Sequence, residues 1–327
     1  MSSHSDPAAS PRVSPRIVVF IGVFFAATSA VLIKASGAHP LAIAFYRMFF
    51  VSILLIPQLG RTGWRRIRAM TRRQVRLCLI GGIFLGFHFA TWISSLSFTS
   101  VASATVLVNT HPILVMVFGL LFLGERIPWD AVAWMVLALA GSIVLSLGGL
   151  QGDSGRLIGN LLAFGGAISA AGYMLVGRAV RQDIDTGVYT FVVYSISAVV
   201  LFIMTLIGRV QLTGYPWFEF AIFLGLAVFP TLLGHSLFNW ALKYVKTSLV
   251  STAILGEPIF ASVMALFIFS EVPGIYTLIG GPVIIVSIYF FTRAESRAAR
   301  RAVAAGAATA GTAAAGAAAE EERTADE

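Results

Sequence analysis

The chain alternates long apolar stretches with short polar connections along nearly its whole length. A helix needs about 20 consecutive apolar residues to cross a bilayer, and most of these stretches reach that length. Inside a bilayer every backbone polar group needs an internal partner, which favours helices over other structures. The pattern therefore predicts an all-α membrane protein with ten transmembrane helices, at residues 17–35, 40–58, 76–95, 101–123, 128–148, 157–177, 187–207, 217–240, 247–269 and 273–292.

The cationic residues of the connections predict how these helices are oriented. Lys and Arg concentrate in cytoplasmic loops, and the connection between the second and third predicted helices carries seven arginines, between Arg61 and Arg76. The opposite side has little beyond Lys34, Arg156 and Arg209. Both termini are then expected to be cytoplasmic, as an even number of helices also requires.

The second half of the chain repeats motifs of the first half. His111-Pro112 recurs 146 residues later as Glu257-Pro258, and each pair begins an apolar run. Internal repeats with proline-interrupted helices at matching positions are typical of secondary transporters, and the interruptions mark the substrate site.

Further matches extend the repeat over most of five helices. Leu85-Gly86 and Trp92 recur as Leu233-Gly234 and Trp240, at an offset of 148 residues. A repeat with five helices, an odd number, places the two copies in opposite orientations. The sequence therefore predicts two inverted repeats related by an axis in the membrane plane, the arrangement used for alternating access.

These motifs resemble the EamA domain of the drug/metabolite transporter superfamily. In that family the fourth helix of each repeat reads Pro, an apolar run, then Gly-Glu-Arg or similar. Here the copies run from Pro112 to Gly124-Glu125-Arg126 and from Pro258 to Ser270-Glu271-Val272, so the second copy departs from the pattern. The resemblance covers residues 17–292 and implies export of small metabolites or drugs. Relatives of this kind include exporters of amino acids, aromatic ones among them.

Composition supports a membrane protein and argues against other classes. Hydrophobic residues make up 57% of the chain and charged residues 12%, with a mean hydropathy of +0.86, whereas soluble domains carry roughly 25% charged residues. The net charge of +8 lies in the connections, which argues against nucleic acid as a partner. Cys78 is the single cysteine, and the sequence has no H-E-x-x-H or phosphate-loop motif. We expect no cofactor and no metal.

The predicted organisation has four parts. A cytoplasmic N-terminal tail, 1–16, precedes the first repeat, 17–148, and the second repeat covers 157–292. The Ala/Gly-rich segment 293–327 has no apolar periodicity that could bury a core and is expected to be a cytoplasmic tail.

Two charged residues inside predicted helices are the first candidates for function. Ionisable groups within a bilayer are costly and mark functional sites by default. Glu257 is predicted either to couple transport to protons, to bind a substrate amine, or to form a structural ion pair. Arg47 needs an anionic or carbonyl partner, for which Glu257 and a substrate carboxylate are the two hypotheses.

Polar and aromatic residues near the two prolines complete the predicted substrate site. Pro112 and Pro258 each remove a helical hydrogen bond, so the helix is expected to be broken there and to expose backbone to a cavity. Residues four positions apart share a helix face, which groups side chains of the third and eighth predicted helices. The full set of predicted substrate-binding residues is Trp92, Asn109, His111, Glu257, Asn239, Trp240, His88 and His235.

The sequence thus favours a secondary exporter of small metabolites in a bacterial inner membrane, a transporter rather than an enzyme. Its expected partners are a small-molecule substrate, the lipid bilayer and protons as a candidate coupling ion, and it is either a monomer or a homodimer. An importer, exchanger or uniporter of the same fold fits the residues as well. An enzyme acting on lipid-linked substrates fits less well, because the arginine-rich connection contains no carboxylate or histidine.

Overall fold

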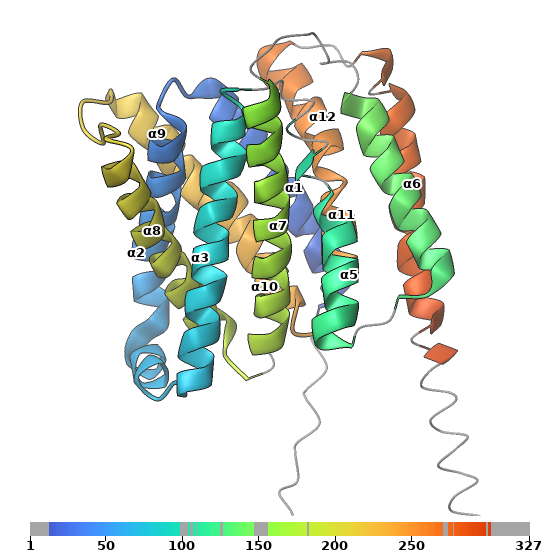
Figure 1. Cartoon of the computed structure of the whole chain (residues 1–327), viewed down its shortest axis with the longest axis horizontal. Helices are drawn as coiled ribbons and strands as arrows, with labels where there is room; N and C mark the ends of the chain where they lie inside the picture. The colour runs from blue at the N-terminus through green and yellow to red at the C-terminus, as the bar shows by residue number, and fades with distance from the viewer. Residues whose placement is uncertain are drawn as a thin grey trace, which may run out of the picture.

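The computed structural model consists of helices and connections, with no strand among the residues it describes (Figure 1). Eight helices are long and apolar enough to cross a membrane, and two shorter apolar helices accompany them. The predicted all-α membrane fold is therefore confirmed, whereas the number of ten spans stays a prediction. The described residues are 13–98, 104, 107–108, 110–124, 127–146, 156–181, 183–270, 274–276, 278–298 and 300–301.

Among the described residues, the first half contains five labelled helices, and the second half contains seven labelled helical segments and a terminal helix. The helices of the first half are α1 (Pro15–Ala35), α2 (Pro40–Arg68), α3 (Arg72–Ser95), α5 (His111–Leu123) and α6 (Trp129–Ser146). Those of the second half are α7 (Arg156–Val180), α8 (Thr186–Ile207), α9 (Trp217–Leu226), the π-helix η2 (Ala227–His235), α10 (Ser236–Ala241), α11 (Thr247–Ile254) and α12 (Glu257–Phe269). A terminal helix, Leu278–Ala298, ends the described spans.

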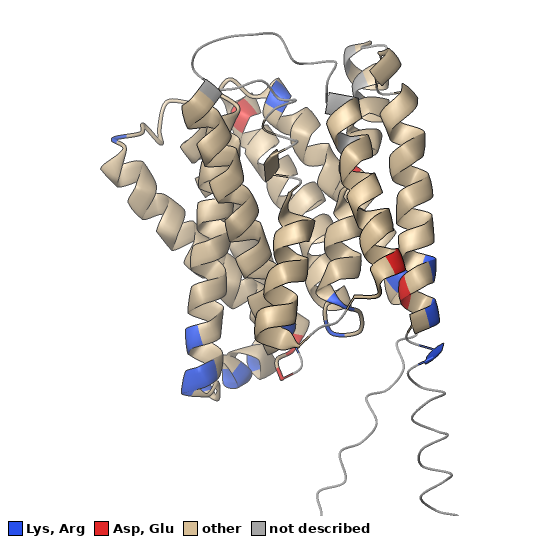
Figure 2. Ribbon diagram, turned by 45° about the vertical axis from the view of Figure 1, so that its right-hand side comes forward, with Lys and Arg blue, Asp and Glu red and all other residues tan. Residues whose placement is uncertain are grey.

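Helix α2 continues ten residues beyond the segment predicted from hydropathy. Gly60 has a φ of 52°, which a residue without a Cβ adopts at little cost, and the chain kinks there. Four of the seven arginines expected in a loop therefore lie on this continuation of α2, and the other three lie at the start of α3, which Thr71 caps through a capping box with Gln74. Figure 2 shows these cations gathered at the end of the bundle where α2 meets α3.

Two of the apolar stretches are irregular: one changes its helical pitch and the other is interrupted. The stretch from Trp217 to Ala241 runs as α9, η2 and α10, with Pro230 inside the π-helix. The stretch from Thr247 to Phe269 divides at Leu255-Gly256 into α11 and α12, just before Glu257-Pro258. Broken helices at membrane depth are tolerated where the freed backbone groups are buried in protein or line a cavity.

Helices from the two halves interlock through small residues. A Cβ added at Gly82 on α3 would lie 2.5 Å from the Ile196 side chain on α8, and one added at Gly234 on η2 would lie 3.1 Å from the Ala26 backbone on α1. Such close approaches are the usual basis of helix packing in membranes. The central bundle is therefore a single core built from both repeats, rather than two cores side by side.

Helix α6 and the terminal helix pair with each other at one edge of the bundle (Figure 1). Trp134 stacks on Phe290 with ring centroids 4.6 Å apart, and Gly141 approaches the side chain of Ile284. Ala138 and Leu255 join Ile284 and Ile288 in a small hydrophobic cluster separate from the main core. The pair also reaches the main core through Met135 and Phe291, and Ser248 on α11 donates to Glu295 on the terminal helix at 2.9 Å.

Candidate functional site

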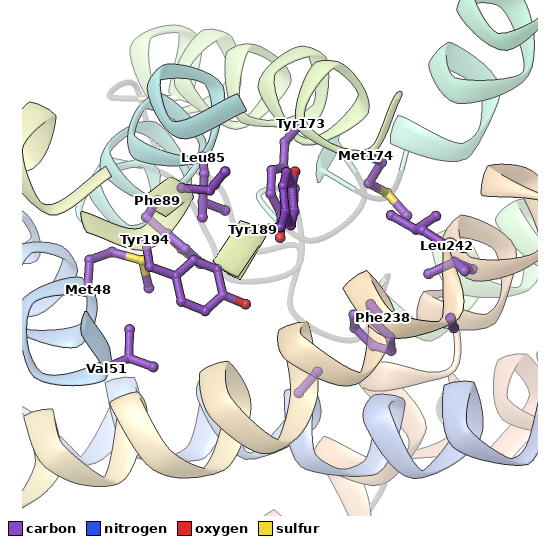
Figure 3. Packing of buried hydrophobic residues seen from close by; sticks show 14 of the residues in the cluster. Met48, Val51, Leu85, Phe89, Tyr173, Met174, Tyr189, Tyr194, Phe238 and Leu242 are labelled. Atoms are coloured by element: carbon purple, nitrogen blue, oxygen red, sulfur yellow. The ribbon is translucent and has the colours of Figure 1, made fainter. Parts of the chain in front are cut away.

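A cavity of about 80 Å³ lies inside the bundle and is lined by residues from both halves of the chain. Ligand pockets typically measure about 300–1,000 Å³, so this cavity is constricted in the present conformation. Phe89, Tyr173 and Phe238 approach it from three different helices (Figure 3). The lining residues are Ala26, Ser29, Arg47, His88, Phe89, Trp92, Val108, His111, Ala170, Tyr173, Met174, His235, Phe238, Asn239, Leu242, Ile254 and Glu257.

Arg47 is the most constrained polar residue of the cavity. It is fully buried on α2, where the side chain cannot reach either end of the bundle. Its Nε donates to Thr231 Oγ1 at 2.7 Å and its Nη1 donates to Ser29 Oγ at 2.9 Å. The guanidinium carbon lies 4.1 Å from the centre of the Phe89 ring, within cation–π range. Nη2 has no hydrogen-bond partner in the described part of the chain.

Glu257 is the carboxylate of the cavity, at the first residue of α12. The sequence suggested it as the ion-pair partner of Arg47. No described residue, Arg47 included, forms an ion pair with it within 4.0 Å; the described ion pairs lie elsewhere. Arg47 is instead satisfied by two hydroxyl groups that the sequence analysis did not identify, because they lie on α1 and η2, which only the fold brings next to α2.

His88 and Trp92 share one face of α3, as their spacing predicted. Their rings are parallel to within 5°, with centroids 6.0 Å apart. Nδ1 of His88 lies 3.0 Å from the carbonyl oxygen of Gly166 on α7. Because a carbonyl only accepts, Nδ1 carries the proton and Nε2 is left as an acceptor in the neutral ring. Trp92 Nε1 is buried without an acceptor among the described residues.

His111 has the same hydrogen-bonding pattern at the start of α5. Its Nδ1 lies 3.0 Å from the carbonyl oxygen of Val108, the carbonyl that the proline was predicted to deprive of its usual donor. The histidine side chain therefore replaces the backbone donor that Pro112 lacks, which keeps the broken helix end satisfied. Pro112 lies in the first turn of α5, where proline fits without strain.

A chain of hydrogen bonds joins three helices of the second half beside the cavity. Tyr173 on α7 donates to Asn239 Oδ1 at 2.8 Å, and Asn239 Nδ2 donates to the Tyr194 hydroxyl on α8 at 3.2 Å. Tyr194 in turn lies 3.3 Å from Ser236 Oγ on α10. Asn239 is thus held rigidly, and its position is fixed by partners rather than by solvent.

Trp240 does not line the cavity, contrary to its equivalence with Trp92. Its ring packs against Tyr244 at 4.7 Å, and the neighbouring Asn239 faces the cavity instead. The π-helix η2 precedes this segment, and its wider turns change the angular position of each residue. Sequence equivalence between the repeats therefore does not predict which side chains of the second copy face inward.

The remaining predicted residues fall into two groups. The cavity is lined by His235, Asn239, His111, His88, Trp92, Glu257 and Arg47. Pro112 and Pro258 are not among the lining residues and lie at the starts of α5 and α12. Asn109 lies outside the described residues. Within the described residues, no three His, Cys, Asp or Glu side chains are grouped as metal ligands would be.

A helical bundle with broken helices around a polar cavity, built from two halves of one membrane-embedded chain, is the architecture of a membrane transporter. The chain belongs to the EamA-like transporter family, whose model matches twice, at residues 14–147 and 157–293. This confirms the family resemblance of the sequence motifs.

Individual relatives are distant but cover most of the chain. The pseudopaline exporter CntI of Pseudomonas aeruginosa is 24% identical, over 85% of this chain and 95% of its own length. The S-adenosylmethionine uptake transporter of Rickettsia felis is 26% identical, over 80% of this chain and 86% of its own. A solved crystal structure with 19% identity has a TM-score of 0.73, over 88% of this chain and 99% of its own, and shows the same fold.

Proposed function

We propose that the protein is a secondary transporter that exports small metabolites across a bacterial inner membrane by alternating access. Amino acids, including aromatic ones, are the leading candidates, and drugs are a further class. The proposal includes ten transmembrane helices, both termini in the cytoplasm, and two inverted repeats at 17–148 and 157–292 between terminal tails. The connection rich in arginine between α2 and α3 would then face the cytoplasm.

The single observation that carries the proposal is the cavity shared by the two halves. Its lining combines aromatic rings, three histidines, one guanidinium and one carboxylate, and substrate sites of inverted-repeat transporters lie at such an interface near the bilayer midplane. An ATP-driven pump would need a nucleotide-binding motif that the sequence lacks. Energy would therefore come from an ion gradient or from the substrate gradient itself.

Glu257 is the proposed proton-coupling residue because it is the carboxylate that lines the cavity. Exchange of a proton for substrate at one group would give antiport. The test is accumulation of labelled amino acids in proteoliposomes, with and without a pH gradient, for the wild type and for Glu257→Gln. Accumulation that needs the gradient and is lost in Glu257→Gln supports antiport. Equal equilibration in both proteins would make the carrier a facilitator and Glu257 structural.

Import or exchange is the second candidate, since one relative is named as an uptake transporter and another as an exporter. Alternating access is reversible, so the residues of the cavity are compatible with either direction. Counterflow with substrate loaded on each side in turn separates the two. Faster release from the side of the α2–α3 connection would contradict export.

A further inference from the structure

Two side chains of opposite charge line one cavity without forming an ion pair. Arg47 comes from the first half and Glu257 from the second, and they do not pair within 4.0 Å. Buried charges are costly unless they are paired. A pair of this kind inside a transporter therefore favours a ligand that brings both a negative and a positive group.

The guanidinium of Arg47 is held so that one of its nitrogens is left without a hydrogen-bond acceptor among the described residues. The hydroxyl of Thr231 accepts a hydrogen bond from Nε, and the hydroxyl of Ser29 accepts one from Nη1. The ring of Phe89 covers one face of the planar group. Thr231 is itself fixed, because its hydroxyl donates to the carbonyl of Leu226 at 2.7 Å. Nη2 remains as a buried donor in a residue that lines the cavity.

A second donor lines the same cavity. Trp92 Nε1 is buried and also has no acceptor among the described residues. An indole nitrogen only donates, and a guanidinium only donates, so a complementary ligand must supply acceptor atoms. A carboxylate supplies two oxygens and matches a guanidinium in geometry and charge.

We propose that Arg47 is the carboxylate-binding residue of the cavity and that the ligand is a zwitterionic amino acid whose ammonium group faces Glu257. This deepens the proposed function and rests on it. A phosphate or a dicarboxylate would place surplus negative charge against Glu257, and a simple cationic drug would be repelled by Arg47. The charge pattern thus favours a zwitterion over either class of singly signed ligand.

The first test needs no mutation. The purified wild-type protein in detergent is titrated calorimetrically with each of the twenty standard amino acids and with its carboxamide, which keeps the ammonium and side chain but not the carboxylate. A hydrogen bond to a charged group contributes about 1.5–3 kcal/mol, which corresponds to at least about tenfold in affinity. We expect at least one amino acid to bind at least about tenfold more tightly than its amide. Binding of no amino acid, or equal binding of acid and amide, would overturn the proposal.

Two arginine variants then assign the effect to one residue. In Arg47→Gln the preference for acid over amide should fall to about one. The matched control is Arg181→Lys: Arg181 is equally buried but outside the cavity, and it donates to Asn239 O, Ile184 O and Thr186 Oγ1. It should retain the full preference. A preference that survives in Arg47→Gln would overturn the assignment to Arg47, and the wild-type comparison stands whether or not this variant folds.

Flux in proteoliposomes separates this inference from the transport proposal. Tighter binding of an amino acid than of its amide, without any flux, would refute the transport proposal and leave the carboxylate-binding role of Arg47 standing. Flux of a substrate without a carboxylate, together with no amino-acid binding, would keep transport and refute the site.

Discussion

Different interactions join the two halves of the chain at the two ends of the bundle. At the end where α8 meets α9, Glu219 is only 3% exposed and accepts from Ser36 Oγ at 2.5 Å and from Gly37 N at 2.7 Å. At the other end Asp183 pairs with Arg73 and Asp185 with Arg66, each at 3.4 Å and with every side chain about half exposed or more.

Both contacts join the same parts of opposite repeats. In the first contact, the α1–α2 connection of the first half binds Glu219 at the start of α9. In the second contact, the α7–α8 connection of the second half binds Arg66 at the end of α2 and Arg73 at the start of α3. Figure 1 shows the α2–α3 connection and the α8–α9 connection at opposite ends of the bundle. The structure therefore has matched contacts between its two halves at opposite ends of the bundle, one buried and one exposed.

The difference in burial decides which closure is stronger. Exposed ion pairs contribute about 0–1 kcal/mol, whereas breaking a buried, hydrogen-bonded charge costs several times more. Arg181 is buried at the weaker end, and burial lowers the pKa of its guanidinium, but its three acceptors all belong to the second half, so it does not join the two halves. We expect the α2–α3 end to open first from the present conformation.

The largest expected effect comes from locking that weaker end. In a Cys78→Ser background, which removes the one native cysteine, Arg73→Cys and Asp183→Cys are joined by a short reducible cross-linker. Flux in proteoliposomes should fall to near zero and return on reduction, because the end can no longer open. Each single-cysteine protein treated in the same way is the control. Full flux in the cross-linked protein would show that this end does not move.

Weakening the stronger end should have the next largest effect. Glu219→Gln removes the charge from two buried hydrogen bonds and should lower the free energy of unfolding by about 1.5–3 kcal/mol. Thermal unfolding in detergent measures this loss. In the Cys78→Ser background, a cysteine placed at Ser29 should also react faster with an impermeant maleimide from the α8–α9 side when Glu219→Gln is present than when Glu219 is intact. Unchanged stability and unchanged labelling would refute the comparison of the two ends.

A smaller loss is expected from a neighbouring contact at the same end. The Tyr46 hydroxyl donates to the carbonyl of Leu212 at 2.5 Å, and its ring stacks 4.9 Å from that of Phe223. Tyr46→Phe keeps the ring and removes the hydrogen bond, for a loss of about 1 kcal/mol in thermal unfolding. Phe223→Leu, which removes the stacked ring, separates packing from hydrogen bonding. A loss as large as that of Glu219→Gln would make the hydroxyl, not the carboxylate, the main closure.

The smallest effect is expected from the exposed ion pairs. Asp183→Asn should change the free energy of unfolding by no more than about 0.5 kcal/mol, since surface substitutions rarely exceed that. Salt screens exposed pairs but not buried ones, so raising ionic strength should mimic Asp183→Asn and leave Glu219→Gln unaltered. Stability measured across a salt series decides this. Greater destabilisation by Asp183→Asn than by Glu219→Gln would invert the proposed order of strength.

Much of the cavity could be predicted from the sequence because its residues break local rules. Arg47 and Glu257 are charged residues within apolar stretches, and the two prolines interrupt helices, so each is visible without a structure. The spacing of His88 and Trp92, and of His235 and Asn239, followed from the helical period alone. These six residues and His111 line one cavity.

The residues that were missed depend on contacts between distant helices. Ser29 and Thr231 are ordinary hydroxyl residues in sequence, and they matter only because α1 and η2 pack beside α2. Glu219 lies near the start of its span, where a carboxylate is expected to be solvated, yet the α1–α2 connection buries it. Pro230 was the available signal for the π-helix, since proline removes a helical hydrogen bond.

The π-helix η2 has a consequence for how duplicated genes diverge. Trp92 and Trp240 occupy equivalent places in the two copies, but a change in backbone pitch turns one toward the cavity and the other toward Tyr244. The two repeats can therefore present different side chains to the cavity even at positions where their sequences match. The similarity of the two copies remains visible in the sequence, while the side chains that they place around the cavity already differ.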